Sequence, residues 1–299
     1  MQEKYFRFKP CRCCEGICEK YDVFEYEVVD GLICKTREKI SHLVDYKSGK
    51  LYGIDYSSCI AVLSLIYDVG TQNCTILELC CAPGAKMMFI LDKLSNAIVV
   101  GVDIRKDRLS VTKSLLRKYN HLNRAQLILG DARNVKISVP CYFEQGGSNY
   151  ESRLFHSPRH LLQSTNTLFD YVLVDAECTI DGKTHVVPKG QQLSNYGAQE
   201  LFEIQSTILQ NGFNHLKHKG RLVYATCSLN PHENECVVST LLDNNTDAKL
   251  VIPSLWDTLP LDKSSKYCTI CQSKHQFGMR MNYEYTQTSG MFVAVVTKD

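Results

Sequence analysis

The sequence has no long apolar run, no excess of charge of either sign and no apolar N-terminal segment. Among its 299 residues, 34 are Lys or Arg and 32 are Asp or Glu, so the formal net charge is only +2. No uninterrupted apolar run approaches the roughly 18 residues that a membrane-spanning helix needs. The N-terminal stretch MQEKYFRFKP is polar and charged and does not resemble a secretory signal. We therefore expect a protein inside the cell, with no membrane partner.

The composition is that of a globular protein rich in thiols. Hydrophobic residues make up 44% of the chain, which allows a sizeable core and one large or two modest domains. In a chain without a signal segment, the 15 cysteines are more typical of thiols or metal ligands than of a disulfide framework. The balanced charge leaves a nucleic-acid partner open, because basic residues can still gather on one face.

From about residue 74 onward, strand-like and helix-like segments alternate. Continuous apolar runs predict strands at 75–79, 97–102, 126–129, 169–174, 221–226 and 291–296. Amphipathic or apolar patterns predict helices at 87–94, 105–119 and 199–216. Buried strands that alternate with helices predict an α/β fold, in which both faces of a doubly wound parallel sheet are covered.

Polar and reactive residues follow these strands where each one ends. They are Cys80 to Lys86, Asp103, Asp131, Asp175 to Cys178, and Thr226 to Ser228. In an open parallel sheet, ligands bind beyond the carboxyl ends of the strands. We therefore expect these segments to converge on one functional site, whereas each acid taken alone is equally typical of a helix cap or a solvated loop.

The first of these turns, CAPGAK, is typical of a nucleoside cofactor without phosphates. It has a single glycine, Gly84, and matches neither the G-x-G-x-x-G pattern nor the phosphate-binding pattern GxxxxGK[ST]. Asp103, at the end of the second strand, is placed to accept the two ribose hydroxyls, and Asp131 is placed near an adenine amino group. This layout favours S-adenosylmethionine over NAD or ATP.

The sequence also carries a specific resemblance to a known family. LELCCAPGAK, VDAEC and YATCSLNPHENECVV resemble three motifs of the RNA cytosine-C5 methyltransferases, the NOL1/NOP2/Sun family. YGIDYSS, the segment from Asp103 to Arg108, GDAR, Arg280 and the closing GMFVAVV are similar to further family segments, so the resemblance covers about residues 50–299. The resemblance implies a Rossmann-like methyltransferase fold with a mostly parallel, doubly wound sheet and an antiparallel C-terminal strand.

The resemblance implies a covalent mechanism and a set of site residues. Cytosine C5 is a weak nucleophile until a thiolate adds to C6, and the family assigns that thiolate to Cys227. Cys178 assists release of the product, while Asp175 and Lys86 organise the base. The residues implied for cofactor binding are Cys80, Ala82, Pro83, Gly84, Ala85, Lys86, Asp103, Arg108, Asp131 and Asp175. The implied partner is RNA, either tRNA or rRNA with an unstacked cytosine, and the protein is expected to be a monomer.

Some residues depart from the family pattern. Glu177 replaces a proline before Cys178, and a carboxylate beside a thiol tends to raise the thiol pKa. Ala85 and Met87 stand where Gly and Ser or Thr are common in the family. No required functional group is missing, which favours an active enzyme. Two alternatives stay open: a weakened family member that acts as an RNA-binding scaffold, and a methyltransferase for DNA or a protein side chain.

Other parts of the sequence carry signals that the motifs do not explain. Residues 1–48 are predicted to be a cysteine-rich extension before a methyltransferase domain at 49–299, and residues 134–168 to be a long insertion. Cysteines and a histidine at 11, 13, 14, 18, 268, 271 and 275 have the spacing of zinc half-sites, although cysteine-rich loops are the simpler interpretation and no metal site is predicted. The insertion (with Tyr150, Arg153, Phe155, His156, Arg159 and His160) and the basic helix at 105–119 are each either RNA contacts or solvated segments.

Overall fold

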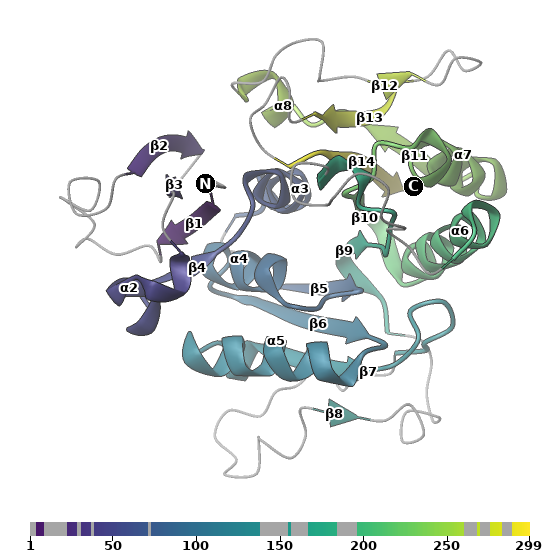
Figure 1. Ribbon diagram of the computed structural model, residues 1–299. Helices are drawn as coiled ribbons and strands as arrows, with labels where there is room; N and C mark the ends of the chain where they lie inside the picture. The colour runs from purple at the N-terminus through teal and green to yellow at the C-terminus, as the bar shows by residue number, and fades with distance from the viewer. Residues whose placement is uncertain are drawn as a thin grey trace.

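In the computed structural model, the described residues form one large mixed sheet and one small antiparallel sheet (Figure 1). The described residues are 4–8, 23–28, 31–36, 39–70, 73–137, 155–156, 167–183, 196–259, 268–269, 276–282 and 289–299. The strands of the large sheet are β5 (Cys74–Leu79), β6 (Ala97–Asp103), β7 (Ala125–Leu129), β8 (Phe155–His156), β9 (Phe169–Asp175), β10 (Leu216–Thr226), β11 (Ala248–Val251), β12 (Cys268–Thr269), β13 (Gln276–Met281) and β14 (Met291–Lys298).

The large sheet is parallel through its centre and antiparallel at its C-terminal side. Its order is β12-β13-β14-β10-β9-β5-β6-β7-β8, and β11 pairs with β14. The strands β10, β9, β5, β6, β7 and β8 are mutually parallel, while β14 runs antiparallel to β10, to β11 and to β13. The predicted fold class, including the antiparallel C-terminal strand, is confirmed.

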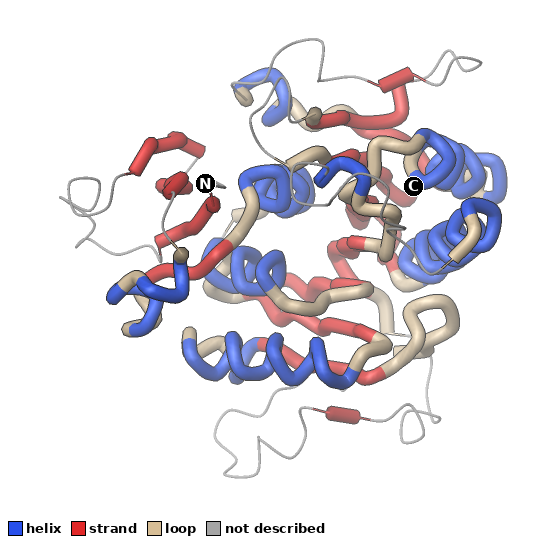
Figure 2. The backbone as a smooth tube through the Cα atoms, in the orientation of Figure 1, coloured by secondary structure: helices blue, strands red, loops and turns tan. Residues whose placement is uncertain are grey.

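Helices cover both faces of this sheet, as the blue segments on either side of the red strands show in Figure 2. The α-helices are α2 (Val44–Lys47), α3 (Tyr56–Ile66), α4 (Ala85–Lys93), α5 (Lys106–Lys118), α6 (Ala198–Asn214), α7 (Glu235–Asn244) and α8 (Leu255–Thr258). Short 3₁₀ turns are η1 (Ile40–His42), η2 (Leu122–Arg124), η5 (Asp181–Lys183) and η6 (Pro231–Glu233).

Alternate strand residues pack on opposite layers of helices. Ile76 and Val99 belong to the core cluster with α3, α4 and α5, whereas Leu77 and Val100 belong to the cluster with α6 and α7. All four are at most 2% exposed, and burial of each such side chain contributes about 1.5–3 kcal/mol. This two-sided burial explains why the strands lack the polar alternation of a half-exposed sheet.

One strand begins earlier than its sequence pattern predicts. Lys219 and Gly220 favour a turn before a strand at 221, but β10 already begins at Leu216, which pairs with Phe169. The ladder is then irregular and resumes at Arg221, with Lys219 at φ 62 inside the irregular segment. The turn-forming residues thus produce a bulge within a strand instead of a loop before it.

The small sheet joins the N-terminal residues to the segment that precedes α3. Its strands are β1 (Lys4–Phe8), β2 (Val23–Val28), β3 (Gly31–Thr36) and β4 (Leu51–Gly53), in the order β2-β3-β1-β4. It lies at the left of Figure 1, beside α2. Because β4 pairs with β1, this sheet crosses the predicted boundary at 48/49, and the division into an extension and a methyltransferase domain stays a prediction.

Within the described residues, the helices are too short or too polar to pass through a lipid bilayer.

Candidate active site

Cys178 and Cys227 lie together at the carboxyl edge of the large sheet. They follow the neighbouring parallel strands β9 and β10, whose register places Asp175 opposite Ala225. The two sulfur atoms are 3.0 Å apart. Cys178 is 6% exposed, and Cys227 is half-buried. The two cysteines, which are 49 positions apart in the sequence, therefore share one site.

The carboxylate of Glu233 links the two loops that carry these cysteines. Oε2 accepts a hydrogen bond from the Thr179 backbone N–H at 2.9 Å, and Oε1 accepts one from the Thr179 hydroxyl at 2.6 Å. Oε1 also accepts a bond from the hydroxyl of Ser228 at 2.9 Å. Since Thr179 follows Cys178 and Ser228 follows Cys227, one buried carboxylate fixes both cysteine-bearing turns. We call these five residues the Glu233 network.

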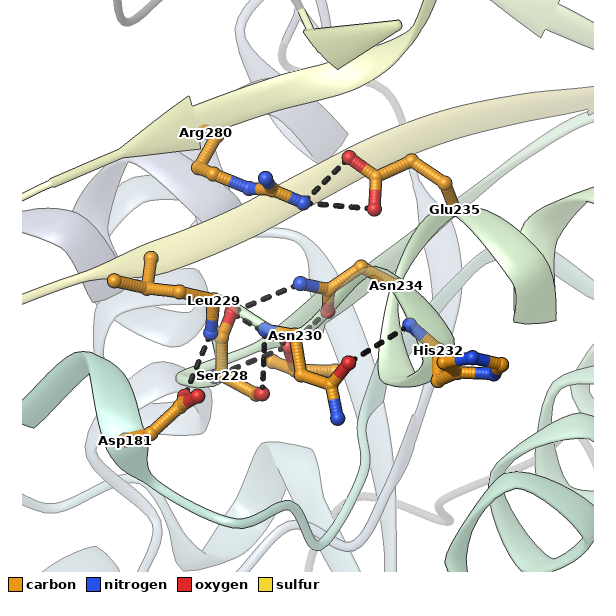
Figure 3. Close-up of polar contacts among 9 residues, drawn as sticks. Asp181, Ser228, Leu229, Asn230, His232, Asn234, Glu235 and Arg280 are labelled. Carbon is orange, nitrogen blue, oxygen red and sulfur yellow. Dashed lines mark hydrogen bonds and ion pairs between the residues drawn. The ribbon is translucent and has the colours of Figure 1, made fainter. Parts of the chain in front are cut away.

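Further hydrogen bonds hold the same loops, and Figure 3 shows those from Leu229 to Asp181 and from Asn234 to Ser228. The Leu229 backbone N–H donates to Asp181 Oδ1 at 2.7 Å, and the Gly182 N–H donates to the Cys227 carbonyl at 3.0 Å. Asn234 Nδ2 donates to the Ser228 carbonyl at 2.9 Å. A Cβ atom on Gly182 would lie 2.7 Å from the Cys227 carbonyl oxygen, so only glycine permits this approach.

An ion pair anchors the helix that follows. Arg280 on β13 donates from Nη2 to both carboxylate oxygens of Glu235, at 2.5 and 2.7 Å, as Figure 3 shows. Glu235 is 2% exposed, and unpaired it would be a buried charge. The family resemblance includes Arg280, and the structure places it behind the cysteine loop.

Lys86 and Asp175 form a second ion pair at this edge. Lys86 Nζ lies 2.6 Å from Asp175 Oδ2, and Lys86 is 8% exposed. Burial by itself would lower the pKa of Lys86, but the Asp175 carboxylate, helped by the charges of Glu78 and Cys227, holds that pKa above its ordinary value. Lys86 therefore stays an ammonium, and its charge stabilises an anion on the Cys227 sulfur.

The structure distinguishes the two thiols. The pKa of Cys178 is raised well above its ordinary value, first by its hydrogen bond to Cys227 and then by burial. The raised pKa favours the thiol form of Cys178, whose sulfur is in hydrogen-bond contact with that of Cys227. The raised pKa agrees with the direction expected from Glu177, but the reason differs because Glu177 points to solvent and its side chain is exposed.

The predicted cofactor residues surround the first turn of the sheet. Asp103, 3% exposed, accepts hydrogen bonds from the backbone N–H of Ala82 at 3.0 Å and of Arg105 at 2.9 Å. Arg108 Nη2 donates to the Ala82 carbonyl oxygen. Gly84 has φ 99, and a Cβ atom on it would lie 2.6 Å from Thr112. The same turn contains Cys80, Pro83 and Ala85. Burial raises the pKa of the Cys80 thiol.

These residues fit S-adenosylmethionine by their chemistry. Each carboxylate oxygen of Asp103 accepts one backbone N–H and keeps a second lone pair for a ribose hydroxyl. The turn has a single glycine, and the Arg108 guanidinium already donates to the Ala82 carbonyl oxygen of that turn. The turn therefore lacks the arrangement of glycines that brings the backbone close to a pyrophosphate. The donor set therefore suits a nucleoside better than a nucleotide.

Asp131 lies after β7 at the same edge of the large sheet, but its carboxylate is hydrogen-bonded to Arg133. Its carboxylate accepts from Arg133 Nε, from Arg133 Nη2 at 2.6 Å and from the Arg133 backbone N–H. The Arg133 guanidinium holds the pKa of Asp131 below its ordinary value. Asp131 is thus an ionised acceptor beside the cofactor turn, and an adenine amino group would share it with Arg133.

Glu78, the next-to-last residue of β5, is a buried acid near Lys86 and Asp175 that the sequence interpretation missed. It is 1% exposed, and its Oε2 atom has no hydrogen-bond partner. Burial raises its pKa from 4.5 to about 8, although the nearby Lys86 charge opposes the shift. A lone acid inside the apolar run TILEL was the available signal, because charged residues are rarely fully buried without a reason.

This shift predicts how stability depends on pH. In the unfolded chain Glu78 loses its proton near 4.5, but in the folded chain it does so near 8, so its contribution to stability is present below 4.5 and is lost as pH rises through 8. We expect Glu78→Gln to reduce the loss of unfolding free energy between pH 5 and 8 by on the order of 3 kcal/mol, measured by urea denaturation. Glu200→Gln, at an exposed position, is the control. Parallel stability curves for wild type and Glu78→Gln would contradict the shift.

Several predicted features lie outside the described residues. The zinc candidates at 11, 13, 14, 18, 271 and 275 are among them, and for Cys268 only the backbone strand is described. Most of the 134–168 insertion is likewise outside, apart from 134–137, β8 and 167–168. Among the described residues, no group of three metal-ligating side chains occurs. The helix predicted at 105–119 is α5, and its RNA contact stays a prediction.

Comparison with known proteins decides the family. The family model described as 16S rRNA methyltransferase RsmB/F matches residues 69–297. The chain belongs to this family. The predicted membership of the NOL1/NOP2/Sun methyltransferases is therefore confirmed, and S-adenosylmethionine is the cofactor of the RsmB/F family.

Relatives in the RsmB/F family extend well beyond the matched region. Ribosomal RNA small subunit methyltransferase B of Escherichia coli O1:K1 / APEC is 36% identical over 196 residues, which are 62% of this chain and 39% of that protein. The protein of the same name from Shigella boydii serotype 18 gives the same identity and coverage. The chain thus matches well under half the length of these relatives.

Solved structures share the fold. A methyltransferase homologue from Pyrococcus horikoshii has a TM-score of 0.71 at 20% identity, covering 100% of this chain and 87% of that one. NSun6 from Pyrococcus horikoshii with SFG has a TM-score of 0.64 at 20% identity, covering 91% of this chain and 61% of that one. At these identities the likeness concerns the fold alone.

Proposed function

We propose that this chain methylates carbon C5 of cytosine in RNA through a transient bond between Cys227 Sγ and cytosine C6. The observation that carries the proposal is the pair of sulfurs 3.0 Å apart, beside a buried ammonium that favours negative charge on Cys227. Addition of the thiolate to C6 makes C5 nucleophilic, as the reaction requires. Most S-adenosylmethionine-dependent methyltransferases need no thiol for methyl transfer. The presence of two cysteines at the site therefore supports this chemistry.

The neighbouring residues fit distinct steps of that reaction. Asp175, held by Lys86 at 2.6 Å, faces the place where charge develops on the ring near N3. After methylation, a solvent water accepts the C5 proton, the electrons of that C–H bond restore the C5–C6 double bond, and the C6–sulfur bond breaks to release Cys227 as a thiolate. Cys178, whose raised pKa favours the thiol, is positioned to assist this release through a hydrogen bond to the departing sulfur. Lys86 and Asp175 thus organise the base, and the two thiols form and break the bond to it.

S-Adenosylmethionine, when bound, supplies an electrophilic methyl group. We assign the ribose hydroxyls to Asp103 and the adenine amino group to Asp131. The backbone from Cys80 to Ala85 lines the site, Lys86 and Asp175 adjoin it, and Arg108 maintains the turn through the Ala82 carbonyl.

RNA is the substrate that this site and the family together support. The relatives are named as ribosomal RNA methyltransferases, which favours rRNA over tRNA for this chain. A cytosine must leave its stack to reach residues at a strand edge, so we expect a loop or a locally opened segment.

The test is transfer of a radiolabelled methyl group from S-adenosylmethionine to bulk RNA, DNA and protein, followed by bisulfite sequencing of the RNA. We expect incorporation into RNA and new protected cytosines in one RNA class. Incorporation into DNA or protein alone would assign another acceptor. Absence of transfer to all three, with S-adenosylmethionine still bound, would favour the RNA-binding scaffold.

A further inference from the structure

The two site sulfurs are already close enough for a second kind of chemistry. A disulfide needs an S–S separation of about 2.05 Å, so the pair must approach by about 1 Å. Seven cysteines are described as free thiols: Cys59, Cys74, Cys80, Cys81, Cys178, Cys227 and Cys236. Within this set, Cys178 and Cys227 are a pair whose sulfur atoms lie 3.0 Å apart.

The surrounding loops hold the sulfurs in this position. Thr179 Oγ1 and Ser228 Oγ are 3.2 Å apart and share the Glu233 carboxylate, directly after the two cysteines. On the far side, the Gly182 N–H bonds the Cys227 carbonyl. These contacts tie the turns after Cys178 and Cys227 to each other, so the two sulfurs are held within about 1 Å of bonding distance.

We propose that Cys178 and Cys227 form a reversible intramolecular disulfide when the protein meets a hydroperoxide. The Cys227 thiolate attacks the terminal peroxide oxygen and becomes a sulfenic acid, and the other oxygen takes a proton from solvent and leaves as water from hydrogen peroxide or as an alcohol from an organic hydroperoxide. The Cys178 sulfur then attacks the sulfenic sulfur, and its proton and the sulfenic hydroxyl leave as water. The two thiols lose two electrons, which reduce the peroxide, and a dithiol reverses the reaction by exchange.

The structure sets the order of these steps. Cys227 is half-buried and lies within the field of the Lys86 ammonium, whereas Cys178 is 6% exposed. Peroxide therefore reaches Cys227 first, and the oxidised sulfur finds Cys178 already in contact. Disulfides in reducing compartments are usually transient and regulatory, which agrees with a bond made only under oxidation.

The consequence for activity depends on the proposed function, but the bond itself does not. A disulfide would occupy the sulfur that adds to cytosine and the sulfur that assists its release, so methyl transfer would stop. It would also protect Cys227 from irreversible oxidation to sulfinic acid.

The bond is tested directly by mass spectrometry. The full chain is treated with hydrogen peroxide, blocked with N-ethylmaleimide under denaturing conditions and digested without reduction. We expect a peptide that joins residues 178 and 227, which disappears after dithiothreitol. Cys236→Ser, at a half-buried cysteine outside the site, is expected to give the same peptide.

Two variants make the test decisive. Cys178→Ser should give no joined peptide and about tenfold more Cys227 sulfinic acid at the same peroxide dose. Thr179→Val, which removes only the hydroxyl that binds Glu233 and Ser228, should slow formation several-fold. Cys227 sulfinic acid in wild type without the joined peptide would overturn the proposal, whether or not the chain methylates RNA. Loss of methyl transfer with the joined peptide, and recovery with dithiothreitol, would support both proposals.

Discussion

Replacing Cys227 by alanine is expected to lower the rate of methyl transfer to RNA cytosine by about 10⁴-fold or more. Without the sulfur, C6 has no nucleophile, and the ring remains aromatic and unreactive at C5. The Lys86 ammonium and Asp175 remain in place, but they have no addition step to assist. The measurement is the initial rate of radiolabel transfer from S-adenosylmethionine into RNA, with cofactor affinity measured separately by calorimetry and expected to change little.

The matched variant is Cys178→Ala, because its sulfur lies 3.0 Å away but has the other role. We expect the covalent RNA adduct to form and persist in this variant, visible as a slower band on a denaturing gel. The double variant should show no such band. RNA that contains 5-azacytidine should trap the wild-type protein in the same assay. Equal methyl transfer by Cys227→Ala and wild type would show that Cys227 is not the nucleophile. A slower band in the double variant would show that the adduct is bonded to neither sulfur.

Replacing Asp175 by asparagine is expected to lower kcat by about 10²–10⁴-fold. Asparagine has nearly the same shape but cannot carry the negative charge that holds Lys86 at 2.6 Å. The buried ammonium would lose its main partner, and burial would then lower the pKa of Lys86. Both the interaction with the ring and the field at Cys227 would weaken. Single-turnover rates over a pH series check this, since the variant should need a higher pH for its best rate.

Strand β9 offers a matched control at its other end. Asp170 pairs with Lys217 at 2.7 Å, and its other oxygen accepts from Thr75. Asp170→Asn keeps one of the two acceptor oxygens, removes the charge that pairs with Lys217, and lies at the opposite end of the strand from the site. We expect it to change the melting temperature modestly but to leave kcat unchanged. A similar drop in kcat for Asp170→Asn and Asp175→Asn would indicate that both act through stability of the sheet.

The sequence by itself determined the fold class and the position of the site along the chain. Apolar strands such as 75–79 and 97–102 are found within a residue of their predicted bounds, because burial on both faces requires an uninterrupted apolar pattern. Parallel strands also bring their carboxyl ends to one edge, so the convergence of the segments that carry Lys86, Asp175, Cys178 and Cys227 followed from topology. The family motifs added the chemistry that periodicity cannot provide.

Only the tertiary structure decided how these residues interact. That Glu233 binds the turns after both cysteines depends on contacts across 54 positions, and no local pattern encodes them. The raised pKa of Glu78 follows from complete burial among Lys86, Asp175 and Asp103, which a strand pattern does not reveal. Hydrogen bonding and desolvation depend on distances between segments that are remote in the chain. The sequence could therefore name the two thiols, but only the folded chain shows that their sulfur atoms lie 3.0 Å apart.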